Sequence, residues 1–290
     1  MNYRHAYHAG NFADVLKHIV LARVIDYMKR KPAPFRVLDA HAGTGIYDLE
    51  SEAAVRTSEW TAGIGRLWGH LDEMPPAARQ LLTPYLDTIT TLNDGGPLKR
   101  YPGSPALAAA LIRPTDRLAL NELHPEDARL LRSNLRHRTN VHVSEQDAYQ
   151  FLKANLPPPE KRGVVLVDPA YEAVDERRRL VAGDAGALDR FATGTYLLWY
   201  PVKDQKPTER LERDVRELVA RYGLKPGIDI RLMLRPPRNT VSLSGAGIMV
   251  LNPPHVLATE MRTILDAIAP ILTGTTREAG TVTILAASQG

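Results

Sequence analysis

The chain has 290 residues, of which 44% are hydrophobic and 24% charged, a balance typical of globular proteins with a full core. Its lack of cysteine excludes disulfides, thiol nucleophiles and cysteine-bound zinc, and no apolar run approaches the roughly 18 residues that span a membrane. The net charge is +4, with 28 arginines against nine lysines, and arginine's bidentate pairing with phosphate favours a nucleic-acid partner without requiring one.

The first elements are a long helix and a short buried strand. Residues 1–5 lack the apolar core of a signal peptide, so we expect a cytoplasmic protein with no membrane partner. Asn11 is a suitable N-cap for a helix reaching about residue 31, which Pro32 and Pro34 terminate. Residues 35–40 follow as a short apolar strand of the kind found in parallel sheets.

The stretch from residue 48 to residue 100 differs from what surrounds it. We predict a helix over 57–70 and a second over 77–92, separated by the pair Pro75 and Pro76. A direct crossover to the next strand would be much shorter than this stretch. The sequence therefore predicts an inserted helical subdomain at 48–100, within a main domain formed by residues 1–47 and 101–290.

Beyond residue 100, strands alternate with helices. This pattern predicts an α/β protein with a mostly parallel, doubly wound sheet, in which ligands bind at the carboxyl ends of the strands. We expect residues 228–234 and 248–251 to form two antiparallel strands. Acidic residues follow or end four predicted strands, and these residues are Asp39, Glu122, Asp147 and Asp168.

The first strand leads into a glycine turn that suits S-adenosylmethionine. The third glycine of the dinucleotide fingerprint is replaced here by Asp48. We expect Asp39 to face the ammonium group of the cofactor, and Gly43 to let the backbone approach closely. Glu122 is placed to accept from both ribose hydroxyls, and Asp147 from the adenine amino group.

The strand at 163–167 ends in Asp168-Pro169-Ala170-Tyr171, one residue away from Asp-Pro-Pro-Tyr. The Asp168 carboxylate and the Pro169 carbonyl can each accept one hydrogen of an exocyclic amino group, while Tyr171 stacks on the base. Methyl transfer to that nitrogen would need no metal and would depend mostly on positioning. Ala170 removes the rigidity of a second proline, so we expect a slower site.

With these residues in place, the chain closely resembles the bacterial 23S ribosomal RNA adenine-N6 methyltransferases of the RlmJ type. The resemblance covers nearly the whole length and includes residues 3–11, 14–18, 39–43, 101–105, 122–125, 191–196 and 199–201. It implies a class I methyltransferase fold with a helical insertion, S-adenosylmethionine as cofactor and 23S rRNA as partner. It also implies that Asp168 is catalytic and touches the cofactor, that Tyr3 lies near the substrate, and that the other cofactor contacts are His18, His41, Ser104, Glu122, Asp147 and Ala148.

Other interpretations remain open at this point. A DNA adenine methyltransferase would share the chemistry but usually carries a larger recognition domain. A protein glutamine methyltransferase normally has asparagine at the position of Asp168. The chain could also be a cofactor-binding RNA-binding protein whose catalysis is weakened by Ala170. His5, His8, Asp14 and His18 do not form a convincing metal site, so we expect no metal, and the sequence does not indicate an oligomeric state.

Overall fold

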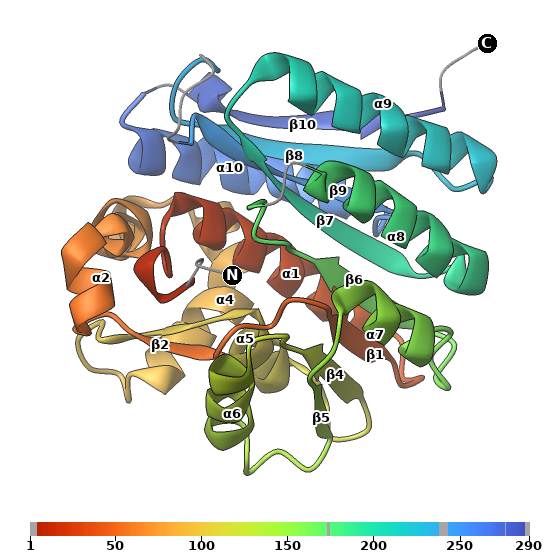
Figure 1. The fold of residues 1–290 in the computed structure, drawn as a ribbon. Coiled ribbons are helices and arrows are strands. Elements are labelled where there is room, and N and C mark those ends of the chain that lie inside the picture. Colours follow the sequence, from red (N-terminus) through yellow and green to blue (C-terminus); the bar gives the residue numbers. More distant parts are fainter. Residues whose placement is uncertain (1–4, 173–174, 238–242, 276, 288–290) are drawn as a thin grey trace.

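The computed structural model describes all residues except 1–4, 173–174, 238–242, 276 and 288–290. Its centre is an eight-stranded sheet in the order β10-β8-β9-β7-β6-β1-β4-β5 (Figure 1). The strands are β1 (Arg36–Asp39), β4 (Arg117–Asn121), β5 (Val141–Ser144), β6 (Gly163–Val167), β7 (Thr195–Val202), β8 (Gly227–Met233), β9 (Gly245–Leu251) and β10 (Gly280–Leu285).

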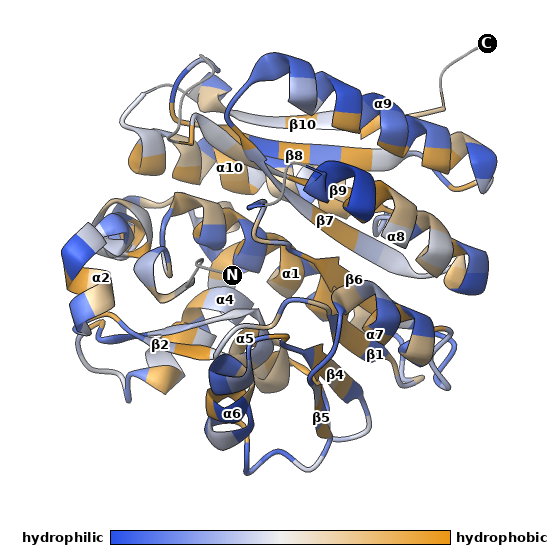
Figure 2. Cartoon of the chain, in the orientation of Figure 1, coloured by the Kyte–Doolittle hydropathy of each residue, from blue (hydrophilic) through white to orange (hydrophobic). Residues whose placement is uncertain are grey.

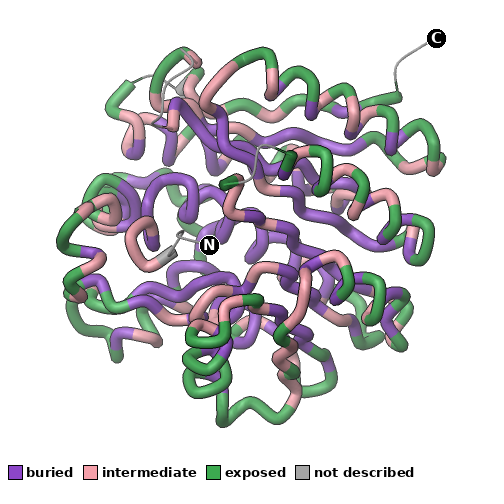
Figure 3. The backbone as a smooth tube through the Cα atoms, viewed as in Figure 1, coloured by how far each residue is buried: buried purple, intermediate pink, exposed green. Residues whose placement is uncertain are grey.

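The sheet is parallel on one side and antiparallel on the other. Strands β5, β4, β1, β6 and β7 are parallel neighbours, whereas β9 runs antiparallel to both β7 and β8, as expected for residues 228–234 and 248–251. Every residue of β6 is buried, because the strand lies in the middle of the sheet under helices on both faces (Figure 3). The carboxyl ends of β1, β4 and β6 therefore meet at one edge.

Helices cover both faces of the sheet, and their apolar sides point inward (Figure 2). One face carries α1 (Phe12–Lys29), α5 (Ser104–Leu111), α6 (Pro125–Asn134) and α10 (Leu257–Thr273). The other face carries α7 (Ala148–Asn155), α8 (Glu176–Phe191) and α9 (Gln205–Arg221). Among the described residues no helix is both long enough and apolar enough to cross a membrane.

Helix α1 begins where the sequence predicted. The Asn11 side chain accepts from the backbone N–H groups of Ala13 and Asp14, both at 3.0 Å, which satisfies two donors that have no partner within the helix. The helix is buried on nearly every side because it lies between the sheet and helix α4 (Pro76–Leu92). Polar side chains on α1 are thus inside the protein and need partners there.

The inserted segment (residues 48–100) differs from the prediction in its first half. The helix expected at 57–70 is found in part: residues 59–69 are helical, but they comprise a π-helical turn (Thr61–Gly65) and α3 (Arg66–Gly69), and a separate helix α2 (Glu52–Thr57) precedes them. Thr57 is the last residue of α2 and does not cap the helical segment that follows. Ser51 caps α2, and Ser58 adopts a left-handed φ of 51° that ends it. Gly63 is non-helical, with φ −98° and ψ −110°, where it packs against Gly10. A tertiary contact therefore overrides local helix propensity.

Two strands that the sequence did not reveal connect the inserted segment to the rest. β2 (Ile46–Asp48) and β3 (Arg100–Pro102) pair antiparallel, with Tyr47 opposite Tyr101. The insert shares its core with α1 and α10, because Ile64, Leu82 and Ile89 belong to the same buried cluster as those helices. The division of the chain into a main domain and a subdomain at 48–100 remains a prediction.

The order of the parallel strands changes direction at β1, with β4 and β5 on one side of it and β6 and β7 on the other. Beyond β7 comes β9, which is antiparallel to both β7 and β8. That is the arrangement of class I S-adenosylmethionine-dependent methyltransferases, with β10 added at one edge. The predicted fold class is confirmed.

Candidate active site

A cavity of about 810 Å³ opens at the carboxyl ends of β1, β4, β6 and β7. This volume lies within the range of roughly 300–1,000 Å³ usual for small-molecule sites. Its lining includes most residues that the sequence singled out, namely His18, His41, Gly43, Ser104, Glu122, Asp147, Ala148, Asp168, Pro169 and Tyr171. The site lies where the doubly wound fold places ligands.

The turn formed by residues 168–171 follows β6 directly. Tyr171 has a left-handed φ of 53°, which is uncommon for a residue other than glycine and costs on the order of 1 kcal/mol. Its hydroxyl donates to the Trp199 carbonyl at 2.8 Å, and the two rings meet edge to face with centroids 5.8 Å apart. Burial raises the pKa of Tyr171 well above its usual value, so the hydroxyl stays protonated. These contacts hold the ring at the cavity wall.

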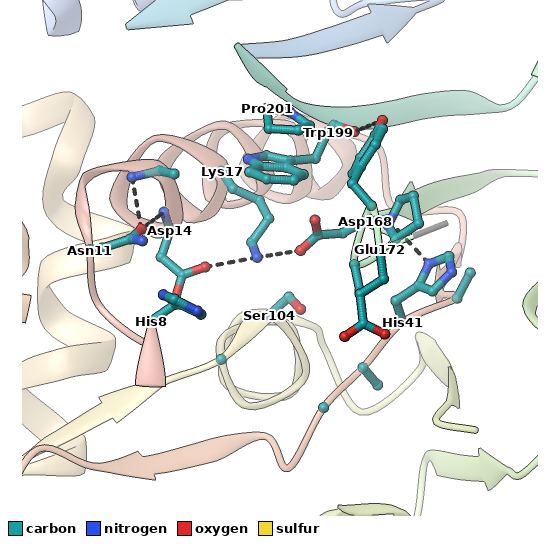
Figure 4. A pocket seen from close by; sticks show the side chains of 18 of the residues that line it. His8, Asn11, Asp14, Lys17, His41, Ser104, Asp168, Glu172, Trp199 and Pro201 are labelled. Carbon is teal, nitrogen blue, oxygen red and sulfur yellow. Dashed lines mark hydrogen bonds and ion pairs between the residues drawn. The ribbon is translucent and has the colours of Figure 1, made fainter. Parts of the chain in front are cut away.

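Lys17 connects Asp168 to α1. Its ammonium lies 2.5 Å from Asp168 Oδ2 and 2.8 Å from Asp14 Oδ1 (Figure 4). Burial alone would lower the pKa of Lys17, but the two carboxylates outweigh it and hold the pKa well above its ordinary value. The three side chains form a charged cluster at the cavity, with one cation between two anions.

His41 supports the same turn from the side of β1. The Asp168 backbone N–H donates to His41 Nδ1 at 3.2 Å, so that nitrogen carries no proton. Burial lowers the pKa of His41 to about 4, in agreement with a neutral ring. His41 therefore fixes the backbone of Asp168, a contact that its expected role beside the cofactor does not describe.

Asp39 lies beneath the cavity and does not line it. The side chain is buried, and it accepts from the Ser104 hydroxyl at 2.7 Å and from the His41 N–H at 3.2 Å. Burial raises the pKa of Asp39 to about 6. Ser104 does line the cavity, and its hydroxyl hydrogen is used by Asp39. The Ser104 oxygen can therefore accept from a ligand, so Asp39 acts on the cavity through Ser104.

Glu122 secures the glycine turn. One of its carboxylate oxygens accepts from the Gly43 N–H and the other from the His124 N–H, both at 2.8 Å. Gly43 has φ +62°, and a β-carbon there would collide with the Tyr47 hydroxyl, so only glycine fits. Each Glu122 oxygen keeps a lone pair for a ligand hydroxyl.

Asp147 serves first as the cap of α7. Its Oδ1 accepts from the N–H groups of Tyr149 and Gln150, and its Oδ2 pairs with Arg179 at 3.0 Å. Ala148, the first residue of that helix, lines the cavity beside it. Contacts of both residues with a cofactor remain predictions.

His18 reaches the cavity from α1 and is fully buried. Its Nδ1 lies 2.8 Å from the Tyr101 hydroxyl, which in turn lies 3.0 Å from the Tyr85 hydroxyl of the inserted segment. The insert thus helps to orient His18. The predicted substrate residue Tyr3 lies outside the described residues.

The chain is similar to known proteins. A sequence model of the family described as "Ribosomal RNA large subunit methyltransferase D, RlmJ" matches residues 32–284. The chain belongs to the RlmJ family.

Two relatives and one solved structure are similar over almost the whole chain. The Escherichia coli (strain K12) protein named Ribosomal RNA large subunit methyltransferase J is 41% identical over 265 residues, 91% of each chain. The Haemophilus influenzae protein of the same name is 42% identical over 282 residues, covering 97% of this chain and 96% of that one. A Legionella pneumophila protein of known crystal structure has a TM-score of 0.85 at 34% identity and covers 97% and 99%.

The cofactor of this class of fold is S-adenosylmethionine, and the hydrogen-bond acceptors of the cavity fit it. The ligand has an ammonium and ribose hydroxyls that donate, and the cavity offers acceptors in Ser104, Glu122, Asp147 and Asp168. No group of three or more potential metal ligands occurs in the part of the chain that is described.

The cavity lining also includes residues that the predicted site did not contain, among them Asp14, Lys17 and Trp199. Asp14 and Lys17 are spaced i, i+3 on α1, so they share one face, and both precede His18. That spacing was visible in the sequence. Their contact with Asp168 was not, since it depends on how α1 packs beside β6.

Proposed function

We propose that this RlmJ-family protein transfers a methyl group from S-adenosylmethionine to the exocyclic N6 of an adenine in 23S ribosomal RNA. The observation that carries the proposal is the Asp168-Pro169-Ala170-Tyr171 turn, whose carboxylate and ring line the cavity beside the residues suited to the cofactor. Family membership supports large-subunit ribosomal RNA as the substrate. On the same ground we propose that the protein acts in the cytoplasm.

We propose the following roles for the residues around the cofactor. Glu122 accepts from the ribose hydroxyls, Asp147 and Ala148 lie at the adenine end, and Ser104 and His18 lie toward the amino-acid tail. Asp39 supports Ser104, and Gly43 allows the backbone to approach. When bound, S-adenosylmethionine supplies a methyl group on a positively charged sulfur.

The chain's own residues prepare the amine. The Asp168 carboxylate and the Pro169 carbonyl each accept one amino hydrogen, which draws the nitrogen lone pair out of conjugation. Such a charge-assisted hydrogen bond contributes about 1.5–3 kcal/mol, and stacking on Tyr171 about 1–3 kcal/mol. Together they offset the few kcal/mol needed to extrude a base. The nitrogen gains a methyl group and loses one proton, which leaves readily because the alkylated nitrogen is strongly acidic.

Lys17 and His41 hold Asp168 in place for this step. His41 accepts from its backbone, and Lys17 contacts only Oδ2, which leaves Oδ1 for the amino group. Tyr3 is proposed to approach the base from the N-terminal segment.

The test is transfer of labelled methyl from S-adenosylmethionine to protein-free 23S rRNA from a strain lacking this protein, followed by nucleoside analysis. We expect the label in N6-methyladenosine, and none on double-stranded DNA of the same sequence. Asp168→Ala should retain RNA binding but lose transfer by about 10²–10³-fold, as when one hydrogen-bonding group of a preorganised site is removed. Persistent transfer by that variant, or preferential labelling of DNA, would contradict the proposal.

A further inference from the structure

The inserted segment contacts the chain just before α1 through one carboxylate. Glu59 lies 3.0 Å from His8 Nδ1, and the Asn11 side-chain amide donates to Glu59 Oε2 at 3.0 Å. The hydrogen bond that Glu59 accepts from His8 raises the pKa of His8, which favours an ion pair. Glu59 also lines the cavity, so the insert forms part of its wall.

Backbone packing reinforces this contact. The Ile64 N–H donates to the Gly10 carbonyl at 2.8 Å, and Gly10 adopts a left-handed φ of +77°. A β-carbon on Gly63 would overlap the same carbonyl and come within 2.7 Å of the Asn11 Cα. The two backbones therefore touch, and residues 8–11 cannot shift without moving residues 59–64.

From residues 10 and 11 an unbroken chain of contacts leads to the catalytic carboxylate. The Gly10 N–H donates to Asp14 Oδ2 at 3.0 Å, while Asn11 caps the helix turn that contains Asp14. Asp14 Oδ1 pairs with Lys17 at 2.8 Å, and Lys17 pairs with Asp168 at 2.5 Å. Figure 4 shows His8, Asn11, Asp14, Lys17 and Asp168 along this line.

We propose that Glu59 is a positioning residue for methyl transfer, holding His8 and Asn11 so that Asp14 and Lys17 fix Asp168 for the amino group. This inference rests on the proposed function. It gives the inserted segment a part in the chemistry, although no residue of that segment forms a hydrogen bond or ion pair with Asp168. A small displacement of a reacting group can cost about a hundredfold in rate, so a remote contact of this kind has a measurable effect.

The experiment compares wild-type protein with Glu59→Ala, Glu59→Gln and the control Glu73→Ala. Glu73 is an exposed residue of the same insert, and its side chain makes no contact with the cavity. For Glu59→Ala we expect kcat on 23S rRNA to fall about ten- to a hundredfold, with KM for RNA and Kd for S-adenosylmethionine within about twofold of wild type. Glutamine keeps one acceptor and should recover part of the rate, and Glu73→Ala should match wild type.

Rates are normalised to the fraction of protein that binds cofactor, so partial unfolding does not mimic the effect. His8→Ala provides a double-mutant cycle. Adding His8→Ala to Glu59→Ala should slow the reaction by a smaller factor than His8→Ala slows the wild-type protein. Additive effects, or a raised KM with kcat unchanged, would overturn the inference.

A crystal structure of Glu59→Ala gives a readout independent of activity. We expect Lys17 to leave its position between Asp14 and Asp168. If Lys17 does not move, the positioning role of Glu59 is overturned, whatever the activity of the wild-type protein. If the wild-type protein methylates no RNA, the proposed function is rejected instead.

Discussion

Lys17 and Asp168 are 151 residues apart in the chain, yet the lysine ammonium lies 2.5 Å from the carboxylate. The Lys17 side chain is 4% exposed and Asp168 13%, so the pair is largely desolvated. Asp14 on the opposite side of Lys17 gives the cluster a net charge of −1. Removing the cation would leave two buried carboxylates facing each other.

Replacing Lys17 with Met should therefore affect both stability and rate. We expect the free energy of unfolding to fall by about 3–5 kcal/mol, the usual cost of breaking a buried ion pair, and methyl transfer to fall about a hundredfold because Asp168 loses its anchor. Chemical denaturation and labelled-methyl transfer measure the two effects. The double variant Lys17→Met/Asp14→Asn should recover stability without recovering transfer, and recovery of both would show that Lys17 matters only for folding.

Tyr171 is expected to contribute through its hydroxyl, which stabilises the fold, and through its ring, which stacks on the base. Tyr171→Phe keeps the ring but loses the hydrogen bond to the Trp199 carbonyl, so we expect a loss of about 1 kcal/mol in stability and a modest loss of rate. Tyr171→Ala also loses base stacking, worth about 1–3 kcal/mol, and should lower kcat/KM for RNA about five- to 150-fold. Steady-state kinetics on both variants test this. Equal losses would argue against stacking on the ring.

Ala170→Pro should raise the turnover rate. Among the described residues, the Ala170 N–H donates no hydrogen bond within the protein, so proline removes no contact there. Proline would restrict the backbone just before Tyr171, so the turn would have fewer conformations in which Asp168 is misplaced for the reaction. A several-fold rise in kcat with little change in cofactor Kd is the expected result. An unchanged or lower kcat would show that flexibility at residue 170 does not limit the reaction.

Cofactor binding should weaken in mild acid because of Asp39. Its pKa is raised to about 6 by burial, so below pH 6 the carboxylate takes up a proton in the free protein. The charged form orients Ser104 as an acceptor and attracts the ligand's ammonium. Kd for S-adenosylmethionine should therefore rise as pH falls through 6, approaching about tenfold per pH unit.

Calorimetric titration between pH 5 and pH 8 measures this change. The pKa of His41 is lowered to about 4, so that ring stays neutral throughout the range. Asp39→Asn serves as the control, with weaker binding that does not respond to pH in the same way. A wild-type Kd that is flat across pH 6 would contradict the assignment.

Much of the fold could be predicted from local sequence. The buried apolar run of β6, the Asn11 cap of α1 and the proline before α4 are short-range signals, and each element appears where the sequence placed it. The helix predicted at 57–70 is interrupted by a kink because Gly63 packs against Gly10, which belongs to a different part of the chain. The β2 and β3 strands were missed because each is three residues long and is defined only by its partner.

The candidate site divides in the same way. The sequence alone determined the chemical groups and the strand ends that carry them. Parallel strands place their carboxyl ends at one edge of the sheet regardless of how the helices pack. Only the tertiary structure decided which groups meet: Lys17 with Asp168, His41 with the Asp168 backbone, and Asp39 with Ser104 rather than with the cavity. Those pairings depend on helix packing and on burial, which arise from the whole fold and from no single stretch of sequence.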